Sequence, residues 1–435
     1  MLRKAQNNIN NTLSEPDTVS DLYKIHHFIG YEIMVNTSHK NLTAVIFLTM
    51  FLTACGGGGG DSDSKSSSAT PPAAIPNETA TDEPSGQNDD IVSDNDASDD
   101  IVSDNDAKAA LIANNTFSLA RTGCGLGGLS VDPALANIAT QHAKYIQYVF
   151  ANSTPTVFSA HYENQIEDIA NVTGRNNPFF KGLSFTDRLI QANYRNVQYG
   201  VMENIAQSAY YSSVGNIIGS DIVADAMAKS LLAAPYHLRS LMLPGSSLTG
   251  TGMVTYKPYQ KDKANNQGYV LVNHSAVMEE SKDKKVEGIF TYPCQGVSGT
   301  VTALYNETPS PVEGTGRDLR NDPIGQPIYI NMPSAQTIEL SNIKFHDVQR
   351  NIDVPTELLD YGQDPHKNTV NELPANEAFI LPITDNLKSC NIASKKNKNC
   401  GLHGDSEYRV SFDVLVDNAT LENKQFTFKT GTVNY

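Results

Sequence analysis

The spacing of apolar residues changes once along this chain, near residue 245, and this change limits the possible fold more than any other feature. Before it, apolar residues recur at helical intervals, as in "AKAALIANNTFSLAR" and "SVDPALANIATQHAKYIQYVF". After it, the segments "TGTGMVTY", "GYVLVNHSAV" and "KVEGIFTYP" are β-branched and aromatic, and Gly, Pro and Asn bound them. Helices followed by strands predict a layered α+β domain.

Several of the helices have recognisable start or stop residues. Asp132 is a good N-cap, and Pro133 fits the first turn of the helix that follows. "FTDRLIQANY" predicts a short helix from Ser184 or Thr186, and "SDIVADAMAKSLLAA" predicts another, which Pro235 ends so that His237 lies just past it. His142 lies inside the helix after Pro133, where a lone histidine is more often a hydrogen-bonded packing residue than a ligand.

The C-terminal third of the chain alternates apolar with polar residues in "QPIYINM", "QTIELSNIKF", "AFILPI", "EYRVSFDVLV" and "KQFTFKT". Because side chains two apart share a face of a strand, one face of the fourth segment carries Tyr408, Val410, Phe412, Val414 and Val416. Such strands, separated by turns, predict an immunoglobulin-like all-β sandwich over residues 294–435. No ligand spacing links its three histidines, for which we expect surface positions: His346, His366 and His403.

The segment "NLTAVIFLTMFLTACGGGGG" predicts an export signal. Its apolar run, residues 42–54, follows Lys40 and is too short to span a bilayer. A cysteine after "LTA" and before glycines resembles a bacterial lipobox, in which Cys55 becomes the lipid-modified first residue. We therefore expect a lipoprotein signal peptide over residues 34–54, starting at Met34, and a mis-assigned N-terminal extension over residues 1–33.

Residues 55–108 are predicted to be a disordered acidic tether. From Gly56 to Lys108 the chain holds thirteen acidic and two basic residues, a net charge of −11 out of −16 for the whole chain. Burying the little apolar surface of this segment would not offset the conformational entropy that the segment would lose on becoming ordered. "DDIVSDNDA" occurs twice, without the glycine turn and closing glutamate of a calcium-binding EF-hand loop. The sequence contains no basic patch, which argues against nucleic acid as a partner.

Five cysteines leave four once Cys55 is assigned to the lipid. An even number in an exported chain predicts two disulfides, and four cysteines allow three pairings. Cys390 and Cys400 enclose a polar loop that a bridge would close. We therefore prefer the pairs Cys390–Cys400 and Cys124–Cys294.

The order of several short motifs resembles the CAP superfamily, which contains the cysteine-rich secretory proteins, antigen five and the plant pathogenesis-related proteins. The motifs are "HAKYI", "HYE", "FTDRLIQANY", "MENIA", "APYHLRSLML", "GTGM" and "YVLV", within residues 109–293. They are most similar to those of the bacterial, SCP-like members. The resemblance implies a three-layer α/β/α sandwich with a central antiparallel sheet. It also implies a cleft lined by two His and two Glu, which in some members binds zinc or another divalent cation.

Carried over by position, the resemblance makes His161 and His237 the two cleft histidines and Glu203 the glutamate of the E-N-I motif. The other family glutamate is missing: Ser230 stands nearest to its place, and Glu163 is the carboxylate left to substitute for it. His161 and His237, with Glu203, are the candidate metal ligands, since imidazole and carboxylate suit zinc. The structural alternative is that these side chains brace loops through hydrogen bonds.

Enzyme motifs are scarce, because neither H-E-x-x-H nor G-x-S-x-G occurs. We therefore favour binding over catalysis, in a lipid-anchored protein of the bacterial cell envelope, at the outer membrane or cell surface. Its cleft would bind a lipid, a glycan or a protein. Two alternatives stay open: a zinc-assisted hydrolase of envelope polymers with Glu203 as base, and an adhesion protein that uses the β-sandwich.

Overall fold

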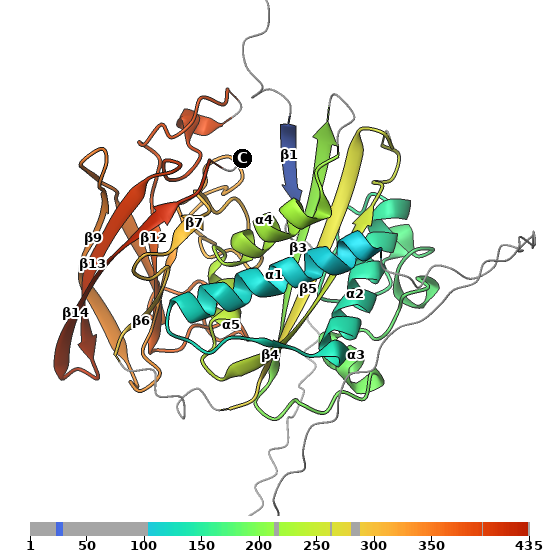
Figure 1. Cartoon of the computed structure of the whole chain (residues 1–435), viewed down its shortest axis with the longest axis horizontal. Coiled ribbons are helices and arrows are strands. Elements are labelled where there is room, and N and C mark those ends of the chain that lie inside the picture. The colour runs from blue at the N-terminus through green and yellow to red at the C-terminus, as the bar shows by residue number, and fades with distance from the viewer. Residues whose placement is uncertain are drawn as a thin grey trace, which may run out of the picture. The chain divides into compact units, whose positions relative to one another are not determined.

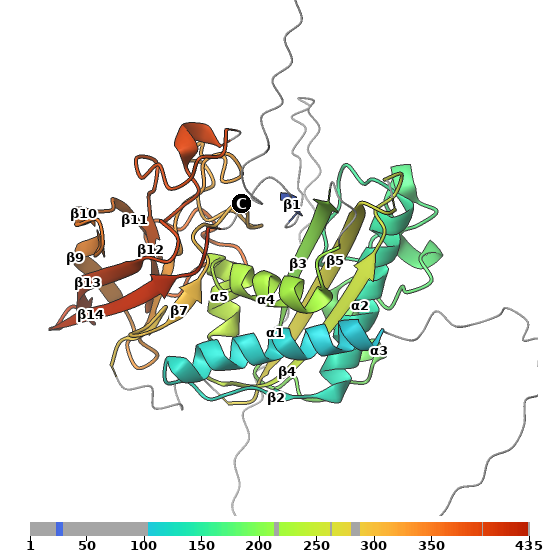
Figure 2. The same cartoon turned by 45° about the horizontal axis from the view of Figure 1, so that its top comes forward.

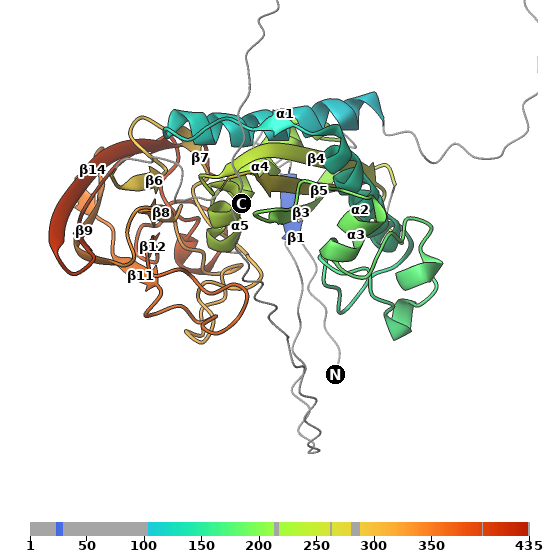
Figure 3. The ribbon, with the colours of Figure 1, turned by 90° about the horizontal axis from the view of Figure 1, so that it is seen from below.

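In the computed structural model of the chain, helices cover both faces of the first sheet (Figures 1 and 3). The structure describes residues 103–212, 217–261, 263–279, 288–393 and 395–433, together with the backbone of residues 23–28. The predicted signal peptide, Cys55 and the tether as far as residue 102 lie outside the described residues.

The helices are α1 (Asp104–Gly123), α2 (Pro133–Asn152), α3 (Phe185–Gln191), α4 (Ser220–Leu231) and α5 (Pro235–Leu241). Local signals explain most of their starts. The Asp132 side chain accepts from the backbone N–H of Ala134 at 2.8 Å, and Pro133 occupies the first turn of α2, as predicted. Ser184 and Asp187 form a capping box at the start of α3.

Two helix ends differ from the sequence-based expectation. α1 starts at Asp104 rather than near residue 109, because Ser103 caps it and accepts from the N–H of Asp106 at 3.1 Å. Asp104 and Asp106 lie in its first turn, where negative charge suits the positive end of the helix dipole. These two residues, which we predicted to be part of the acidic tether, therefore belong to the start of a helix. His237 does not follow a helix end: Pro235 opens α5, which contains His237.

The first sheet has the order β1-β3-β5-β4-β2. Its strands are β1 (Tyr23–Phe28), β2 (Ser130–Val131), β3 (Val201–Ser212), β4 (Ser246–Tyr256) and β5 (Asn266–Val277). The three long strands are antiparallel neighbours, and β1 pairs with the outer edge of β3. The motif "MENIA" lies in β3, which the hydrophobic pattern did not identify as a strand, and this register places Glu203 beside His274.

Two glycines let α2 lie directly on β4. A Cβ added to Gly252 would stand 2.4 Å from the Thr140 backbone, and one on Gly250 would stand 2.1 Å from the Ala136 nitrogen. α2 forms one apolar core with this face of the sheet, while α1, α4 and α5 form a second core on the opposite face. The predicted α/β/α layering is thereby confirmed.

The C-terminal region is all-β, as predicted, and contains two sheets (Figure 2). One has the order β10-β9-β13-β14-β7 and the other β11-β12-β8-β6. The predicted face of β13 is buried, since Tyr408, Val410 and Val414 have no exposed surface. The strands are β6 (Phe290–Tyr292), β7 (Ser298–Thr300), β8 (Ile328–Asn331), β9 (Ile338–Asp347), β10 (Ile352–Asp353), β11 (Thr356–Asp360), β12 (Glu377–Pro382), β13 (Glu407–Val416) and β14 (Thr420–Thr430).

The C-terminal region is joined to the first domain by covalent and apolar contacts. Both preferred disulfides are present, and Cys124–Cys294 links the end of α1 to the chain after β6. The core around α1, α4 and α5 continues into the C-terminal region, where it includes Tyr292, Tyr329 and Phe379. β6, which the sequence placed in the first domain, pairs with β8.

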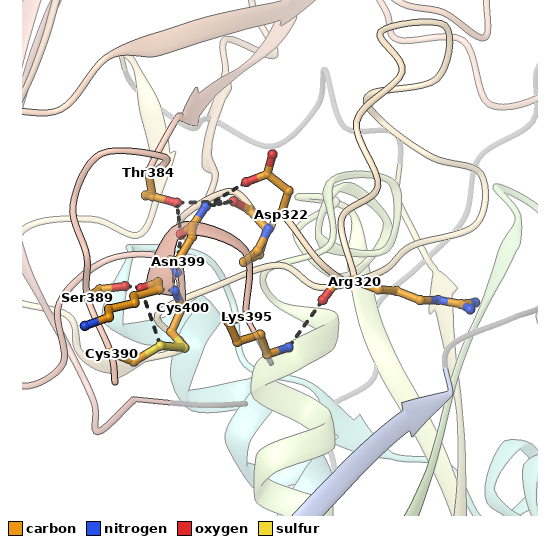
Figure 4. Close-up of a disulfide and its surroundings, with 11 residues drawn as sticks. Arg320, Asp322, Thr384, Ser389, Cys390, Lys395, Asn399 and Cys400 are labelled. Atoms are coloured by element: carbon orange, nitrogen blue, oxygen red, sulfur yellow. Dashed lines mark hydrogen bonds between the residues drawn. A yellow bond between two sulfur atoms is a disulfide. The ribbon is translucent and has the colours of Figure 1, made fainter. Parts of the chain in front are cut away.

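The Cys390–Cys400 bridge closes a loop that a buried amide holds in place (Figure 4). Asn399 donates to Asp322 Oδ1 at 3.2 Å and accepts from the Thr384 hydroxyl at 2.8 Å. The surface position predicted for His366 is wrong: it is 9% exposed, and its ring contacts Tyr236 of α5 edge-on. Within the described part of the chain, every helix is too short or too polar to cross a membrane.

Candidate functional site

A cavity of about 500 Å³ lies beside the first sheet, and residues of α2, β3 and α5 line it. Aliphatic and aromatic side chains make up much of its lining, among them Ile146, Phe150, Phe158, Ile205 and Tyr256. His161 and His237 also line it, and their ring centroids are 6.5 Å apart. The cavity is therefore largely apolar, with two imidazoles in its wall.

The structure brings together three of the four predicted cleft residues. His161 Nδ1 lies 3.0 Å from Glu203 Oε1, and the two histidine rings stack at an angle of 25°. The loop after α2, strand β3 and helix α5 supply these residues. His161 is the accessible member, since 41% of its side chain is exposed, whereas Glu203 is 3% exposed.

Arg188 of α3 holds the Glu203 carboxylate. Its Nη2 donates to Glu203 Oε1 at 2.9 Å and to Oε2 at 2.7 Å, and only 1% of the Arg188 side chain is exposed. Burial by itself would raise the pKa of Glu203, but the Arg188 charge and hydrogen bonds from His161 and His274 hold that pKa well below its usual value. Glu203 is therefore a carboxylate that accepts hydrogen bonds, and a low pKa makes it a weak base.

Glu307 of the C-terminal region contacts Nδ1 of His237, as Glu203 contacts Nδ1 of His161. Its Oε1 lies 3.0 Å from His237 Nδ1 and accepts from the backbone N–H groups of Tyr236 and His237 at 2.8 and 3.2 Å. Its side chain has no exposed surface. Burial raises the pKa of Glu307, against the lowering effect of these hydrogen bonds.

Glu163, proposed to replace the missing family glutamate, lies behind the cavity wall. It has no exposed surface and is absent from the cavity lining. Its Oε1 bonds His142 Nδ1 at 2.8 Å, and its Oε2 accepts from the N–H of Lys181 at 2.6 Å. The prediction that His142 is a hydrogen-bonded packing residue is confirmed. Ser230 bonds the backbone of its own helix and does not line the cavity.

The sequence reading missed three residues of the site: Arg188, His274 and Glu307. Arg188 lies in the motif "FTDRLIQANY", but nothing in that motif showed that its charge is buried. His274 lies on β5, 3.0 Å from Glu203 Oε2, and burial lowers its pKa. Assigning β3 as a strand paired with β5 would have found it. Glu307 stands in a turn-rich linker 70 residues from His237, and no local pattern connects the two.

The residues present provide a partial donor set for a metal. No group of three or more His, Cys, Asp or Glu side chains among the described residues is arranged to hold an ion. His161 and His237 each bond a buried carboxylate through Nδ1, a pattern that presents Nε2 as a ligand atom. Catalytic zinc sites use three protein ligands. These residues therefore fit a two-imidazole cation site and do not complete a catalytic zinc centre.

Comparison with known proteins agrees with this architecture. Residues 115–273 match the sequence model of CAP, the cysteine-rich secretory protein family. No curated protein matches the chain. The matched residues run from α1 to β5 and include the three converging residues, whereas Glu307 lies beyond them. Residues 115–273 of this chain therefore form a CAP domain of the cysteine-rich secretory protein family.

Proposed function

We propose that this chain is an extracytoplasmic binding protein whose CAP domain holds an apolar ligand in the cavity, with the polar end of the ligand at His161 and His237. The lining of the cavity carries this proposal. Its volume of about 500 Å³ lies within the range of small-molecule sites, roughly 300–1,000 Å³. Transfer of apolar ligand surface from water to such a lining is the main driving force for binding. Of the lipid, glycan and protein ligands considered, a lipid suits this chemistry best.

Filling the cavity tests the proposal. Ala209 lines it from β3, and Ala209→Phe would put a ring into the ligand's volume. The matched control is Ala226→Phe on α4, at a half-buried residue outside the lining. The neutral apolar fluorophore N-phenyl-1-naphthylamine serves as the probe. We expect Ala209→Phe to weaken its binding about tenfold or more, and Ala226→Phe to leave it unchanged. Equal affinities in the two folded variants would refute binding in this cavity.

The location of the protein outside the cytoplasm is supported by the CAP domain and by two disulfides, which persist in oxidising compartments. We extend this to a lipid anchor at Cys55, in the bacterial cell envelope, at the outer membrane or cell surface. The motif around Cys55 supports the anchor. Metabolic labelling with a fatty acid should mark the full chain, and Cys55→Ser should abolish the label. A label that survives the substitution contradicts this assignment.

A divalent cation at His161 and His237 is compatible with the binding function, and a zinc-assisted hydrolase is the alternative. When bound, zinc would supply a Lewis acid. Two features favour binding: the donor set lacks a third ligand among the described residues, and Glu203 bonds Arg188. Zinc calorimetry on the parent chain, on His161→Ala and on His237→Ala tests the cation site, and absent binding in the parent removes the zinc-assisted hydrolase. If zinc binds tightly, hydrolysis assays on wall fragments with and without a chelator discriminate the two: turnover that the chelator abolishes favours the hydrolase, and no turnover favours the binding protein.

A further inference from the structure

Among the described residues of the C-terminal region, Glu307 is the one buried carboxylate that contacts a histidine of the cavity, His237. The next residue, Thr308, lines the cavity itself. The segment around Glu307 thus forms part of the wall, although it lies outside the residues that match the CAP family. A CAP domain by itself would lack this carboxylate and this part of the wall.

The hydrogen bonds to Glu307 determine which nitrogen of His237 carries a proton. Oε1 accepts from two backbone N–H groups, so it is an acceptor whether or not Glu307 is ionised. Any proton on Glu307 would lie on Oε2, which has no hydrogen-bond partner among the described residues. Because Oε1 also faces His237 Nδ1 at 3.0 Å, Nδ1 must donate to it. The neutral ring then has a lone pair at Nε2, for which no partner is found in the described structure.

His161 is held in the same way. Its Nδ1 faces Glu203 Oε1, which also accepts from Arg188 at 2.9 Å and is therefore an acceptor. The proton of a neutral His161 ring thus lies on Nδ1, and Nε2 is the acceptor, again without a partner among the residues that the structure describes. Both rings line the cavity, with their centroids 6.5 Å apart, and each neutral ring has Nε2 as its hydrogen-bond acceptor.

We infer that Glu307 is a positioning residue of the cavity, and that the two histidines select apolar ligands whose head group donates a hydrogen bond, such as a long-chain alcohol. This inference rests on the proposed function and narrows its ligand class. A carboxylate head group has no proton to donate to Nε2 and would bring its oxygens against two lone pairs. The C-terminal region is then part of the binding site, because it holds His237 in the acceptor state.

Two ligands of equal chain length, dodecanol and dodecanoate, test the selection by calorimetry at pH 8. We expect the full chain to bind the alcohol about tenfold more tightly, as one unmatched buried polar contact predicts. Glu307→Met removes Oε1 and should reduce this preference to about twofold or less. Glu307→Gln keeps an acceptor oxygen for the backbone N–H groups and should retain the preference.

Glu377→Met is the matched control. Glu377 is also a buried glutamate of the C-terminal region that bonds a residue of α5, Arg239, at 2.7 Å, but it does not line the cavity. It should lower stability without changing the preference for the alcohol. Loss of the preference in Glu377→Met as well as in Glu307→Met would assign the effect to docking of the two regions and overturn the role of Glu307.

The protonated ring nitrogen is measured separately, by NMR of histidine labelled with ¹⁵N, with His237→Gln to assign the signal. The parent chain should show His237 protonated at Nδ1, and Glu307→Met should lose this state. A parent signal from protonated Nε2 overturns the inference, even if Glu307→Met does not fold. Equal binding of alcohol and carboxylate overturns the selection while leaving the proposed function intact. If neither compound binds, the proposed function fails, and the NMR result still decides the role of Glu307.

Discussion

Arg188 Nη2 lies 2.7 Å from Glu203 Oε2, and both side chains are at least 97% buried. Glu203 in turn contacts His161 and His274. This ion pair connects α3 to β3 and fixes the carboxylate behind the cavity. Such a pair adds little net stability compared with an apolar replacement of both partners, but removing one partner leaves a buried charge.

Arg188→Met should therefore lower the free energy of unfolding by roughly 3–5 kcal/mol, because the charge of Glu203 loses its partner. Urea denaturation followed by circular dichroism measures this. The control is Lys229→Met, which breaks the half-exposed Lys229–Asp225 pair of α4 and should cost below about 1 kcal/mol. Similar losses in the two variants would show that the Arg188 pair is not a buried charge pair in solution.

The stability of the protein should fall as the pH is lowered from 7 to 5. Burial holds the pKa of His274 below its usual value, so in this window the unfolded chain binds a proton that the folded chain does not. The loss is at most about 1.4 kcal/mol per pH unit for this group. Glu203, whose pKa is also lowered, adds a loss only below about pH 4.5.

Denaturation curves of the parent and of His274→Asn at pH 7 and pH 5 check this. We expect the variant to be less stable at pH 7 and to show a smaller difference between the two pH values. His403→Gln is the companion variant, because burial also lowers the pKa of that histidine in the C-terminal region. An unchanged pH dependence in His274→Asn would contradict the assignment to His274.

Gly252→Ala should destabilise the CAP domain by about 1–3 kcal/mol. The added methyl group would stand 2.4 Å from the Thr140 backbone. Because these are backbone atoms of a helix and not the end of a flexible side chain, they cannot easily move aside. The thermal unfolding midpoint reports the effect. Gly127→Ala, where nothing lies within 4 Å of the added carbon, should leave the midpoint nearly unchanged. Equal midpoints for the two variants would mean that α2 does not pack this closely on β4.

Removing Cys124–Cys294 should cost more stability than removing Cys390–Cys400. The paired cysteines are 170 and 10 residues apart, so the first bond restricts the unfolded chain more. The chain-entropy estimate gives about 5 and about 3 kcal/mol for the two bonds. Double Cys→Ser variants of each pair, compared by thermal denaturation, test the order. A larger loss of stability on removing Cys390–Cys400, the bond that closes the short loop, would show that the buried hydrogen bonds of Asn399, and not chain entropy, control the difference.

Local sequence signals located α1 to α4, the motif order of the CAP domain and five strands of the C-terminal region, β8, β9, β12, β13 and β14, but not α5. Asp132 and Pro133 mark the start of α2, and the alternation from Tyr408 to Val416 marks the buried face of β13. These signals act over a few residues, through backbone hydrogen bonds and side-chain periodicity, so they can be read without the fold. The four cysteines outside the signal segment limited the disulfides to three pairings, and one loop favoured the pairing that the structure contains.

The tertiary structure alone decided which carboxylate faces which histidine. From the sequence, Glu163 was the nearest substitute for the missing family glutamate, but its backbone position turns it to His142. Glu307 reaches His237 because the C-terminal region packs on α5, through an apolar core shared by both regions. A buried acceptor is defined by the donors that surround it, and here those donors are 70 and 71 residues away, so no local pattern encodes the pairing.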